Sequence, residues 1–384
     1  MCYNDFILDY HALYASAPSL FRDERQAKLR TKQLEVHYFE HLSIDPRDMS
    51  DIGKLAPELC EVAFPQVLEP LKQQIGDEGK TIKTLFRLQD SNLIESVLML
   101  YPDRATLCIS SQVGCAIGCP FCATGKLGFK RNLSSREIIE QVFFAARSLT
   151  SPAKFGPNTS DVHTLYEPRR LTNIVFMGEG EPTQNLDNIF EALEQICAPS
   201  INHTDDSTTT VRTQTARPNF GIPARNVTIS TSGIIPGINR LAEAKFPLRL
   251  AISLHAPTDE LRSKLVPINK KYDLDTVLDA AFQYYQTKKR RVSIEYALML
   301  NVNDSEKHAN TLAKILNRRG SNWVHVNLIP LNNVEGSPWT ASTDSATSTF
   351  LETLRSRGIQ TTLRESRGQD IDGACGQLAA LSDS

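Results

Sequence analysis

From residue 104 onward the chain alternates short β-rich runs with helical stretches, and this alternation limits the possible folds more than any other feature. Each run is rich in Val, Ile or Leu and is followed by apolar residues at helical spacing. Successive strand–helix units predict a parallel sheet, either an open doubly wound sheet or a barrel. The runs are Ala105–Ser110, Leu171–Met177, Val227–Thr231, Leu248–Ser253, Val292–Leu298, Val324–Pro330 and Ile359–Leu363.

Two further features of this series can be read from the sequence. The helix expected over residues 135–148 begins with capping-box spacing, because Ser134 precedes Glu137 by three positions. Residues 150–170 and 198–225 are polar, rich in Pro, Thr and Asn, and aperiodic, which predicts two surface insertions.

The region before the series has a different pattern. Apolar residues from residue 19 to about 74 recur at helical spacing, which predicts a small helical domain. Residues 80–101 alternate between apolar and polar side chains around Asp90–Asn92, which predicts two antiparallel strands joined by a turn. We therefore expect a helical accessory domain over 1–78, a linking hairpin over 79–103 and the βα series over 104–384.

Charge and hydropathy exclude several classes of protein. The 384 residues carry 42 Lys and Arg against 44 Asp and Glu, so the protein has no overall positive charge that would attract nucleic acid. Any RNA contact must be local. No stretch of 18 apolar residues and no signal-like N-terminus is present, which predicts a cytoplasmic protein without a membrane span. The candidate RNA contacts are Lys126, Lys130 and Arg131, then Lys270 and Lys271, and then Lys288–Arg291. The first cluster is favoured because it adjoins the cysteines described next.

Four of the eight cysteines lie within fifteen residues, which favours metal or redox chemistry over disulfides. Cys115, Cys119 and Cys122 follow the first strand, close enough to converge on one inorganic centre from a single loop. A zinc site normally takes four ligands. A [4Fe–4S] cluster on three thiolates leaves one iron open to a substrate. The spacing favours the cluster and leaves zinc as the alternative.

The residues around these cysteines extend the pattern. Cys115-x-x-x-Cys119-x-Phe121-Cys122 resembles the signature of radical S-adenosylmethionine (SAM) enzymes. Seven ordered motifs are similar to those of one branch, the RlmN family of RNA adenine carbon-2 methyltransferases, from about residue 20 to 380, insertions aside. These motifs are residues 105–115, 124–132, 177–182, 227–233, 252–257, 327–330 and 367–378.

The resemblance implies an α/β fold, namely a partial (β/α)6 radical SAM barrel with a small N-terminal helical domain and a β-hairpin extension. It also implies one [4Fe–4S] cluster on the three cysteines and two SAM molecules per turnover. The residues implied to contact SAM lie at strand ends, where barrel enzymes build their active sites. They are Gly180, Glu181, Ser230, Ser253, Leu254, His255 and Asn332. Without the resemblance, the first two would be part of an acidic turn and the His and Asn would be structural.

The resemblance assigns three catalytic roles. Cys375, which lies among glycines near the end of the chain, carries the methyl group. Cys108 is the thiol that resolves the adduct, and Glu95 is the base that removes the proton from carbon 2 of adenine. Each residue also has a plainer interpretation: a buried cysteine, a strand residue that fills the barrel, and a surface carboxylate.

Carbon 2 of adenine is too electron-poor to attack a sulfonium methyl group, whereas a radical can add to it. The resemblance implies that Cys375 is methylated, that a 5′-deoxyadenosyl radical removes one hydrogen from this methyl group, and that the resulting carbon radical adds to the base. Glu95 and Cys108 then release the product and leave a disulfide.

The implied substrates are an adenine in the peptidyl-transferase region of 23S ribosomal RNA and an adenine beside the anticodon of transfer RNA. An electron donor such as flavodoxin and a monomeric enzyme are also expected. Two alternatives remain open: a carbon-8 adenine methyltransferase of the same superfamily, and a non-catalytic zinc protein that binds RNA.

Overall fold

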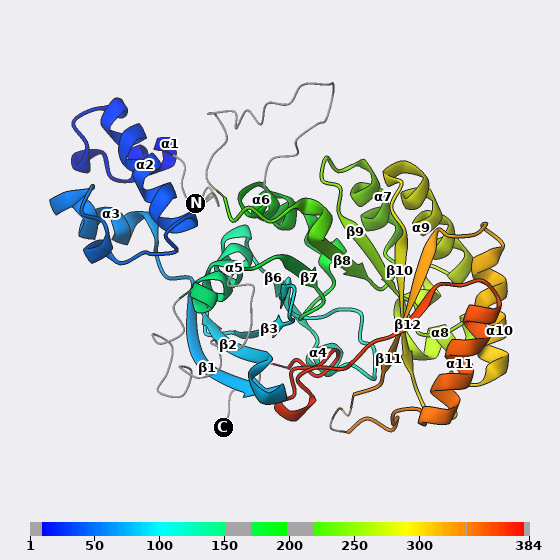
Figure 1. Ribbon diagram of the computed structural model, residues 1–384. Coiled ribbons are helices and arrows are strands. Elements are labelled where there is room, and N and C mark those ends of the chain that lie inside the picture. Colours follow the sequence, from blue (N-terminus) through cyan, green and yellow to red (C-terminus); the bar gives the residue numbers. More distant parts are fainter. Residues whose placement is uncertain (1–9, 151–169, 198–218, 333, 335, 380–384) are drawn as a thin grey trace.

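The computed structural model describes residues 10–150, 170–197, 219–332, 334 and 336–379, and a ten-stranded sheet dominates this part of the chain (Figure 1). The strand order is β1-β2-β3-β4-β7-β8-β9-β10-β11-β12. From β4 to β12 all neighbours run parallel. Every expected run is therefore confirmed as a strand. These strands are β4 (Ala105–Cys108), β7 (Asn173–Phe176), β8 (Val227–Thr231), β9 (Arg249–Ser253), β10 (Val292–Leu298), β11 (Val324–Pro330) and β12 (Thr361–Leu363).

Helices connect the parallel strands and cover the outer face of the sheet (Figure 1). Helix α6, for example, buries Leu186, Ile189 and Leu193 on one face, with the spacing of an amphipathic helix. The sheet stays open, since β1 and β12 end it without pairing with each other. A partial barrel of βα units is therefore confirmed. The helices are α5 (Ser135–Thr150), α6 (Leu186–Ile196), α7 (Ile235–Glu243), α8 (Asp259–Leu265), α9 (Leu274–Lys288), α10 (Glu306–Asn317) and α11 (Asp344–Ser356).

Between β4 and α5 the chain forms a compact loop region. Strands β5 (Gln112–Gly114) and β6 (Phe129–Asn132) pair antiparallel and enclose the short helix α4 (Ala123–Leu127). The three clustered cysteines lie between β5 and α4. This region sits just after the first barrel strand, so it faces the carboxyl ends of the parallel strands.

Three antiparallel strands extend the barrel sheet. Strand β2 (Thr81–Leu88) and strand β3 (Leu93–Leu100) form the expected hairpin, and β3 pairs antiparallel with β4. The turn between them contains Asp90, whose side chain accepts a hydrogen bond from the backbone N–H of Asn92 (3.1 Å). The expected hairpin extension is confirmed.

The helical region ends earlier than the sequence predicts. Residues Leu68–Gly76 form strand β1, which pairs with β2, instead of continuing a helical pattern to about residue 74. Pro65 and Pro70 lack the N–H group that a helix interior requires. Strand β1 tolerates Pro70 because it is an edge strand, with a register shift between Pro70 and Lys72.

The N-terminal helices lie to one side of the barrel (Figure 1). They are α1 (Tyr10–Ser16), α2 (Glu24–Phe39) and α3 (Ala56–Ala63). Tyr38 of α2 stacks on Phe143 of α5, with ring centroids 4.3 Å apart. The expectation of an N-terminal helical region is confirmed, and this aromatic contact attaches it to the first barrel helix.

The two expected insertions fall mostly on residues 151–169 and 198–218, which lie outside the described residues. Among the helices that the structure describes, none combines the length and the apolar character needed to cross a membrane.

After β12 the chain turns back toward the antiparallel strands (Figure 1). The backbone N–H of Gly368 donates to the Asp77 carboxylate (2.7 Å), and Arg367 donates to the carbonyl of Leu100 (3.0 Å). The C-terminal segment, residues 364–379, therefore joins the last barrel strand to the hairpin extension. It carries Cys375.

Candidate active site

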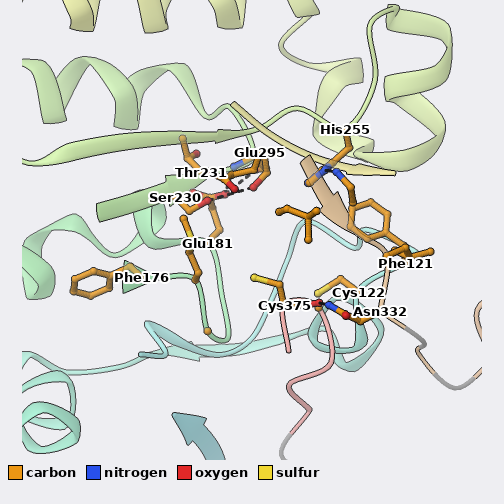
Figure 2. Close-up of a pocket in the computed structure, with 18 of the residues that line it drawn as sticks. Phe121, Cys122, Phe176, Glu181, Ser230, Thr231, His255, Glu295, Asn332 and Cys375 are labelled. Atoms are coloured by element: carbon orange, nitrogen blue, oxygen red, sulfur yellow. Dashed lines mark hydrogen bonds between the residues drawn. The ribbon is translucent and has the colours of Figure 1, made fainter. Parts of the chain in front are cut away.

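A cavity of about 160 Å³ lies at the carboxyl ends of the parallel strands (Figure 2). Strands β7 to β11 and the loops after them supply one side. The cysteine loop and the C-terminal segment supply the other. Among the residues assigned from the sequence, those that line this cavity are Cys122, Gly180, Glu181, Ser230, Ser253, His255, Asn332 and Cys375. The tertiary structure thus gathers residues from six separate segments of the chain.

Glycine shapes the cysteine loop. Gly114 has a φ of +69°, and a Cβ atom there would lie 1.8 Å from the carbonyl oxygen of Gly128. The same carbonyl accepts a hydrogen bond from the backbone N–H of Cys115 (3.0 Å). Only glycine permits this approach. The three cysteine side chains pack against an apolar cluster at the top of the barrel.

The arrangement of the thiols bears on which metal they can hold. Within the described ranges, no three His, Cys, Asp or Glu side chains are placed to bind a single metal ion. The cysteine loop supplies three thiols, whereas a structural zinc ion normally takes four ligands. In a [4Fe–4S] cluster three cysteine thiolates can each ligate a different iron, and the donor set of this loop fits that arrangement. Burial, followed by the neighbouring Cys122 and Cys115 thiols, raises the pKa of Cys119, so binding must release protons.

Glu181 connects the loops that follow β7 and β8. Its Oε1 accepts hydrogen bonds from the N–H and hydroxyl of Thr183 (3.1 and 2.6 Å), and its Oε2 accepts from the N–H and hydroxyl of Ser232 (2.7 and 2.8 Å). Gly180 has a φ of +105°, and a Cβ atom there would lie 2.6 Å from Cβ of Gln112. Glu181 therefore fixes the cavity wall, and Gly180 leaves room beside it.

Two serines and a histidine complete this wall. The hydroxyls of Ser230 and Ser253 lie 3.3 Å apart at the ends of β8 and β9. His255 accepts the backbone N–H of Ala297 at Nδ1 (3.0 Å). Burial, and then the charge of Arg262, lowers the pKa of His255 to about 3. Its imidazole is therefore neutral and is an acceptor at Nδ1.

Asn332 and Leu254 are placed differently from the residues above. The Asn332 side chain donates to the carbonyl of Cys375 (3.0 Å) and accepts from Gln369 (2.7 Å). Asn332 therefore lines the cavity and also holds the C-terminal segment. Leu254 is fully buried, and its side chain does not line the cavity.

Cys375 projects from the C-terminal segment into the space that Cys122 also faces (Figure 2). The backbone N–H of Ala123 donates to the carbonyl of Gly376 (2.8 Å), which ties this segment to the cysteine loop. Nη1 of Arg364 lies 3.8 Å from Sγ of Cys375. The arrangement places a nucleophilic side chain between the cysteine loop and the half-buried positive charge of Arg364.

Cys108 lies at the end of β4, inside the barrel. It lines a second, smaller cavity together with Cys375, and both cysteines are free thiols. Burial, to which Cys375 adds, raises the pKa of Cys108 to about 12, and Arg364 opposes this shift. The structure therefore brings together the two cysteines that the sequence analysis paired.

Glu95 is buried on β3, so its interpretation as a surface carboxylate is wrong. Lys83 of β2 lies 3.0 Å from Oε1 of Glu95, and the backbone N–H of Ala379 donates to Oε2 (3.1 Å). Lys83 also donates to the carbonyl of Asp372 (3.3 Å). Glu95 does not line the main cavity, because the C-terminal segment covers it.

Sequence analysis missed two residues of the site, Glu295 and Arg364. Both line the main cavity. Oε1 of Glu295 accepts from Ser293 (2.6 Å) and Asn327 (2.9 Å), whereas its buried Oε2 has no hydrogen-bond partner. A carboxylate inside the apolar run of β10 was the available signal, since buried charges are rare without a function.

The fold and the site together define a class of protein. Residues 161–312 match the family model of the radical SAM superfamily, a stretch that follows the cysteine loop and covers barrel strands. A solved radical SAM methyltransferase from Sphaerobacter thermophilus is similar over 97% of this chain and 98% of its own, with 38% identity and a TM-score of 0.81. The chain is therefore a radical SAM enzyme.

Relatives that are similar over most of their length identify the family within this class. The chain is 51% identical to a probable dual-specificity RNA methyltransferase RlmN of Bifidobacterium adolescentis, over 92% of this chain and 85% of that protein. It is 42% identical to the corresponding protein of Salinispora tropica, over 95% of this chain and 91% of that protein. The chain belongs to the RlmN family.

Proposed function

We propose that this enzyme methylates carbon 2 of an adenine in the peptidyl-transferase region of 23S ribosomal RNA and of the adenine beside the anticodon of transfer RNA. The observation that carries the proposal is the position of Cys375, which faces the cavity of the cysteine loop and shares a smaller cavity with Cys108. A methyltransferase that used SAM directly would need neither thiol. The names of the full-length relatives support RNA as the substrate.

The three clustered cysteines hold one [4Fe–4S] cluster in this proposal, and two SAM molecules bind in turn for each product. When bound, these groups supply the methyl group, the electron and the hydrogen-abstracting radical. Gly180, Ser230, Ser253 and His255 line the space for the cosubstrate, and Glu181 fixes its wall. An electron donor such as flavodoxin, a monomeric state and a cytoplasmic location complete the proposal.

Cys375 accepts the methyl group on sulfur, and its methylene carbon, after loss of one hydrogen atom from the methyl group, forms the bond to adenine. This adduct carries an odd electron, which must leave it together with the proton of carbon 2. That electron would pass to the group held by Cys115, Cys119 and Cys122. Cys108 then attacks Sγ of Cys375. The new S–S bond forms as the bond between Sγ and the methylene carbon breaks. The electron pair of the broken bond stays with the carbon, which takes up a proton and becomes the product methyl group. Cellular thiols must reduce the disulfide before the next turnover.

Glu95 accepts the proton from carbon 2. Nζ of Lys83 lies 3.0 Å from Oε1 of Glu95 and orients the carboxylate. The hydrogen bond from Ala379 must break before the adduct reaches Glu95, so the C-terminal segment has to move between methyl loading and product release. The division of the chain into 1–78, 79–103 and 104–384 belongs to the same proposal, with the first unit contacting RNA.

Cysteine variants test the order of these steps. The Cys108→Ala variant can accept the methyl group on Cys375 and form the bond to RNA, but it cannot release the RNA. We therefore expect it to accumulate a covalent protein–RNA adduct, seen as a slow-migrating gel band whose apparent mass falls after ribonuclease treatment. Glu95→Gln should do the same. Cys375→Ala should form no adduct. Cys197→Ala, a buried cysteine without an assigned role, serves as the matched control. Normal turnover by Cys108→Ala would show that this thiol is structural.

Product analysis separates the alternatives. Mass spectrometry of digested RNA should find 2-methyladenosine, whereas 8-methyladenosine would assign the carbon-8 reaction. The protein purified without air should be brown and contain about four irons per chain. Replacing Cys115, Cys119 and Cys122 together by Ala should remove both the iron and 5′-deoxyadenosine formation. A colourless wild-type protein that contains zinc would support the non-catalytic alternative.

A further inference from the structure

A larger cavity, of about 1220 Å³, opens at the other end of the barrel. We call its opening the lower mouth. It is surrounded by residues at the amino ends of the parallel strands, opposite the end that holds the cysteine loop. These residues include Thr106, Asn173, Thr228, Arg249, Ser293 and His325. The side chains are mostly polar, unlike those of a barrel interior that only has to be filled.

Positive charge gathers at the lower mouth. Arg249 and the run Lys288–Arg291, which connects α9 to β10, line it, and we call these five residues the basic rim. Among the ion pairs of the described residues, none involves the basic rim. Burial, and then the charge of Arg249, lowers the pKa of Arg290, as expected when cations lie close together without counter-ions.

The hydrogen bonds of the rim go to neutral groups. Nε of Arg249 donates to the carbonyl of Arg225 (2.9 Å), Lys288 donates to the carbonyl of Ala244, and Arg291 donates to the side chain of Gln360. These contacts orient the side chains and leave their charge uncompensated. A chain with a net charge of −2 has many carboxylates available, so a cluster of unpaired cations indicates an anionic ligand.

The basic cluster next to the cysteine loop is different. Arg131 forms ion pairs with Asp90 (2.6 Å) and Glu137 (2.9 Å), and Lys130 donates to Asn92 (2.9 Å). The charge of Arg131, in the cluster that the sequence placed nearest the active site, is therefore neutralised within the protein. Lys130 keeps its charge because Asn92 is neutral, but none of the five cations of the basic rim is in an ion pair among the described residues, so the rim is the stronger candidate for RNA contact.

The lower mouth leads to the catalytic residues. The larger cavity shares Met177, Glu295 and Arg364 with the main cavity, so the two meet inside the barrel. Arg364 lies beside Cys375, and the free Oε2 of Glu295 is a buried acceptor at the junction. A polar group that enters through the lower mouth can therefore reach Cys375 without crossing the cysteine loop.

We propose that the RNA substrate enters the barrel through the lower mouth, with its phosphates on the basic rim and its unstacked target base directed along the barrel toward Cys375. This inference rests on the proposed function. Phosphate contacts with Lys and Arg supply affinity without sequence preference. The base has to leave its stack because the reacting sulfur lies inside the protein. The cosubstrate space stays at the other end, so both substrates can be bound together.

Helix α9 offers a matched test, because basic pairs lie at both of its ends. The rim variant is Lys289→Glu with Arg291→Glu, and the control is Lys270→Glu with Lys271→Glu, which precedes α9. All four side chains are exposed, and both variants change the net charge by the same amount. The probe is a transcript of the 23S ribosomal RNA region that contains the target adenine, with affinity measured by filter binding across salt concentrations.

We expect the rim variant to bind this RNA at least about tenfold more weakly than wild type. The slope of the logarithm of the association constant against the logarithm of the salt concentration should become shallower by about 1 to 2, because each phosphate contact contributes about 0.7 to 0.9 to this slope. The control should stay within about twofold of wild type. Methylation of Cys375 by SAM without RNA, measured by mass spectrometry of the protein, should be unchanged in both variants, which shows that the fold and the methyl-loading site are intact.

The outcomes separate this inference from the proposed function. If the wild type methylates the RNA and the rim variant binds it normally, the entrance lies elsewhere and the inference is wrong. Loss of affinity in the control alone would place the RNA at the cysteine-loop end. If the wild type itself methylates no RNA, the proposed function fails.

Discussion

Glu140 shows how burial and pairing compete at a single residue. It lies on α5, its side chain is only 16% exposed, and Nε of Arg136 is 3.4 Å from its Oε1. Arg136 also donates to the carbonyl of Ala63, so this pair sits where the first barrel helix meets the N-terminal helices. Burial raises the pKa of Glu140 to about 7, and Arg136 opposes the shift without cancelling it.

This shift predicts a pH dependence of stability. The folded state takes up a proton at Glu140 at higher pH than the unfolded state, whose carboxyl group has its ordinary pKa of 4.5. The free energy of unfolding therefore falls as the pH rises from about 4.5 to about 7. We expect Glu140→Gln to gain on the order of 2 kcal/mol relative to wild type between about pH 5 and about pH 8, measured by urea unfolding. Glu58→Gln, on the exposed face of α3, is the control, and an equal change in both variants would contradict the assignment.

At the scale of one element, α5 begins as its sequence predicts. The backbone N–H of Glu137 donates to Oγ of Ser134 (3.2 Å), and the N–H of Ser134 donates to the Glu137 carboxylate (2.9 Å). These reciprocal bonds form a capping box and satisfy two N–H groups that a helix start leaves open. Arg131 binds the same carboxylate, so the helix start is also connected to the loop region that carries the cysteines.

Removing the cap should weaken this connection. Ser134→Ala deletes the side-chain acceptor, and we expect the free energy of unfolding to fall by about 1 kcal/mol. Ser134→Thr keeps a hydroxyl and should lose less. Thermal unfolding followed by circular dichroism measures both variants. If Ser134→Ala equals wild type, the box contributes nothing to stability.

At the scale of the whole molecule, the C-terminal segment that carries Cys375 depends on strands from the beginning of the chain. Asp77 accepts from the N–H of Gly368 (2.7 Å), and its own N–H donates to Asp370 (3.0 Å). A Cβ atom at Gly76 would lie 2.3 Å from the Asp370 carboxylate, so glycine is needed for this approach. The end of β1 and the turn that follows it therefore hold the segment that carries Cys375.

Asp77→Ala tests this dependence. The variant loses the acceptor for Gly368, so we expect faster hydrogen exchange over residues 368–379 and slower methylation of Cys375. Iron content should not change, because Asp77 lies away from the cysteine loop. Glu69→Ala, an exposed position on β1, provides the control. Unchanged exchange in Asp77→Ala would mean that the other contacts hold the segment alone.

The sequence by itself determined the parallel strands, the helix cap and the cysteine loop. Each of these is set by neighbours in the chain: apolar runs of strand length, a Ser and a Glu three positions apart, and glycines that permit a close turn. The prediction for strand β1 was wrong because its conformation is not set by neighbours in the chain. Prolines interrupt the apolar pattern there, and only pairing with β2 decides that the segment is a strand and not an irregular helix.

Only the tertiary structure decided how charges and thiols are distributed. Lys83 and Glu95 form a buried pair because β2 and β3 are covered by the C-terminal segment, and local sequence does not report that cover. Arg131 is neutralised by Asp90 and Glu137, whereas the basic rim is not, although both are similar basic clusters in the sequence. Charge compensation depends on which side chains meet across the fold, and for that reason spacing along the chain could not predict it.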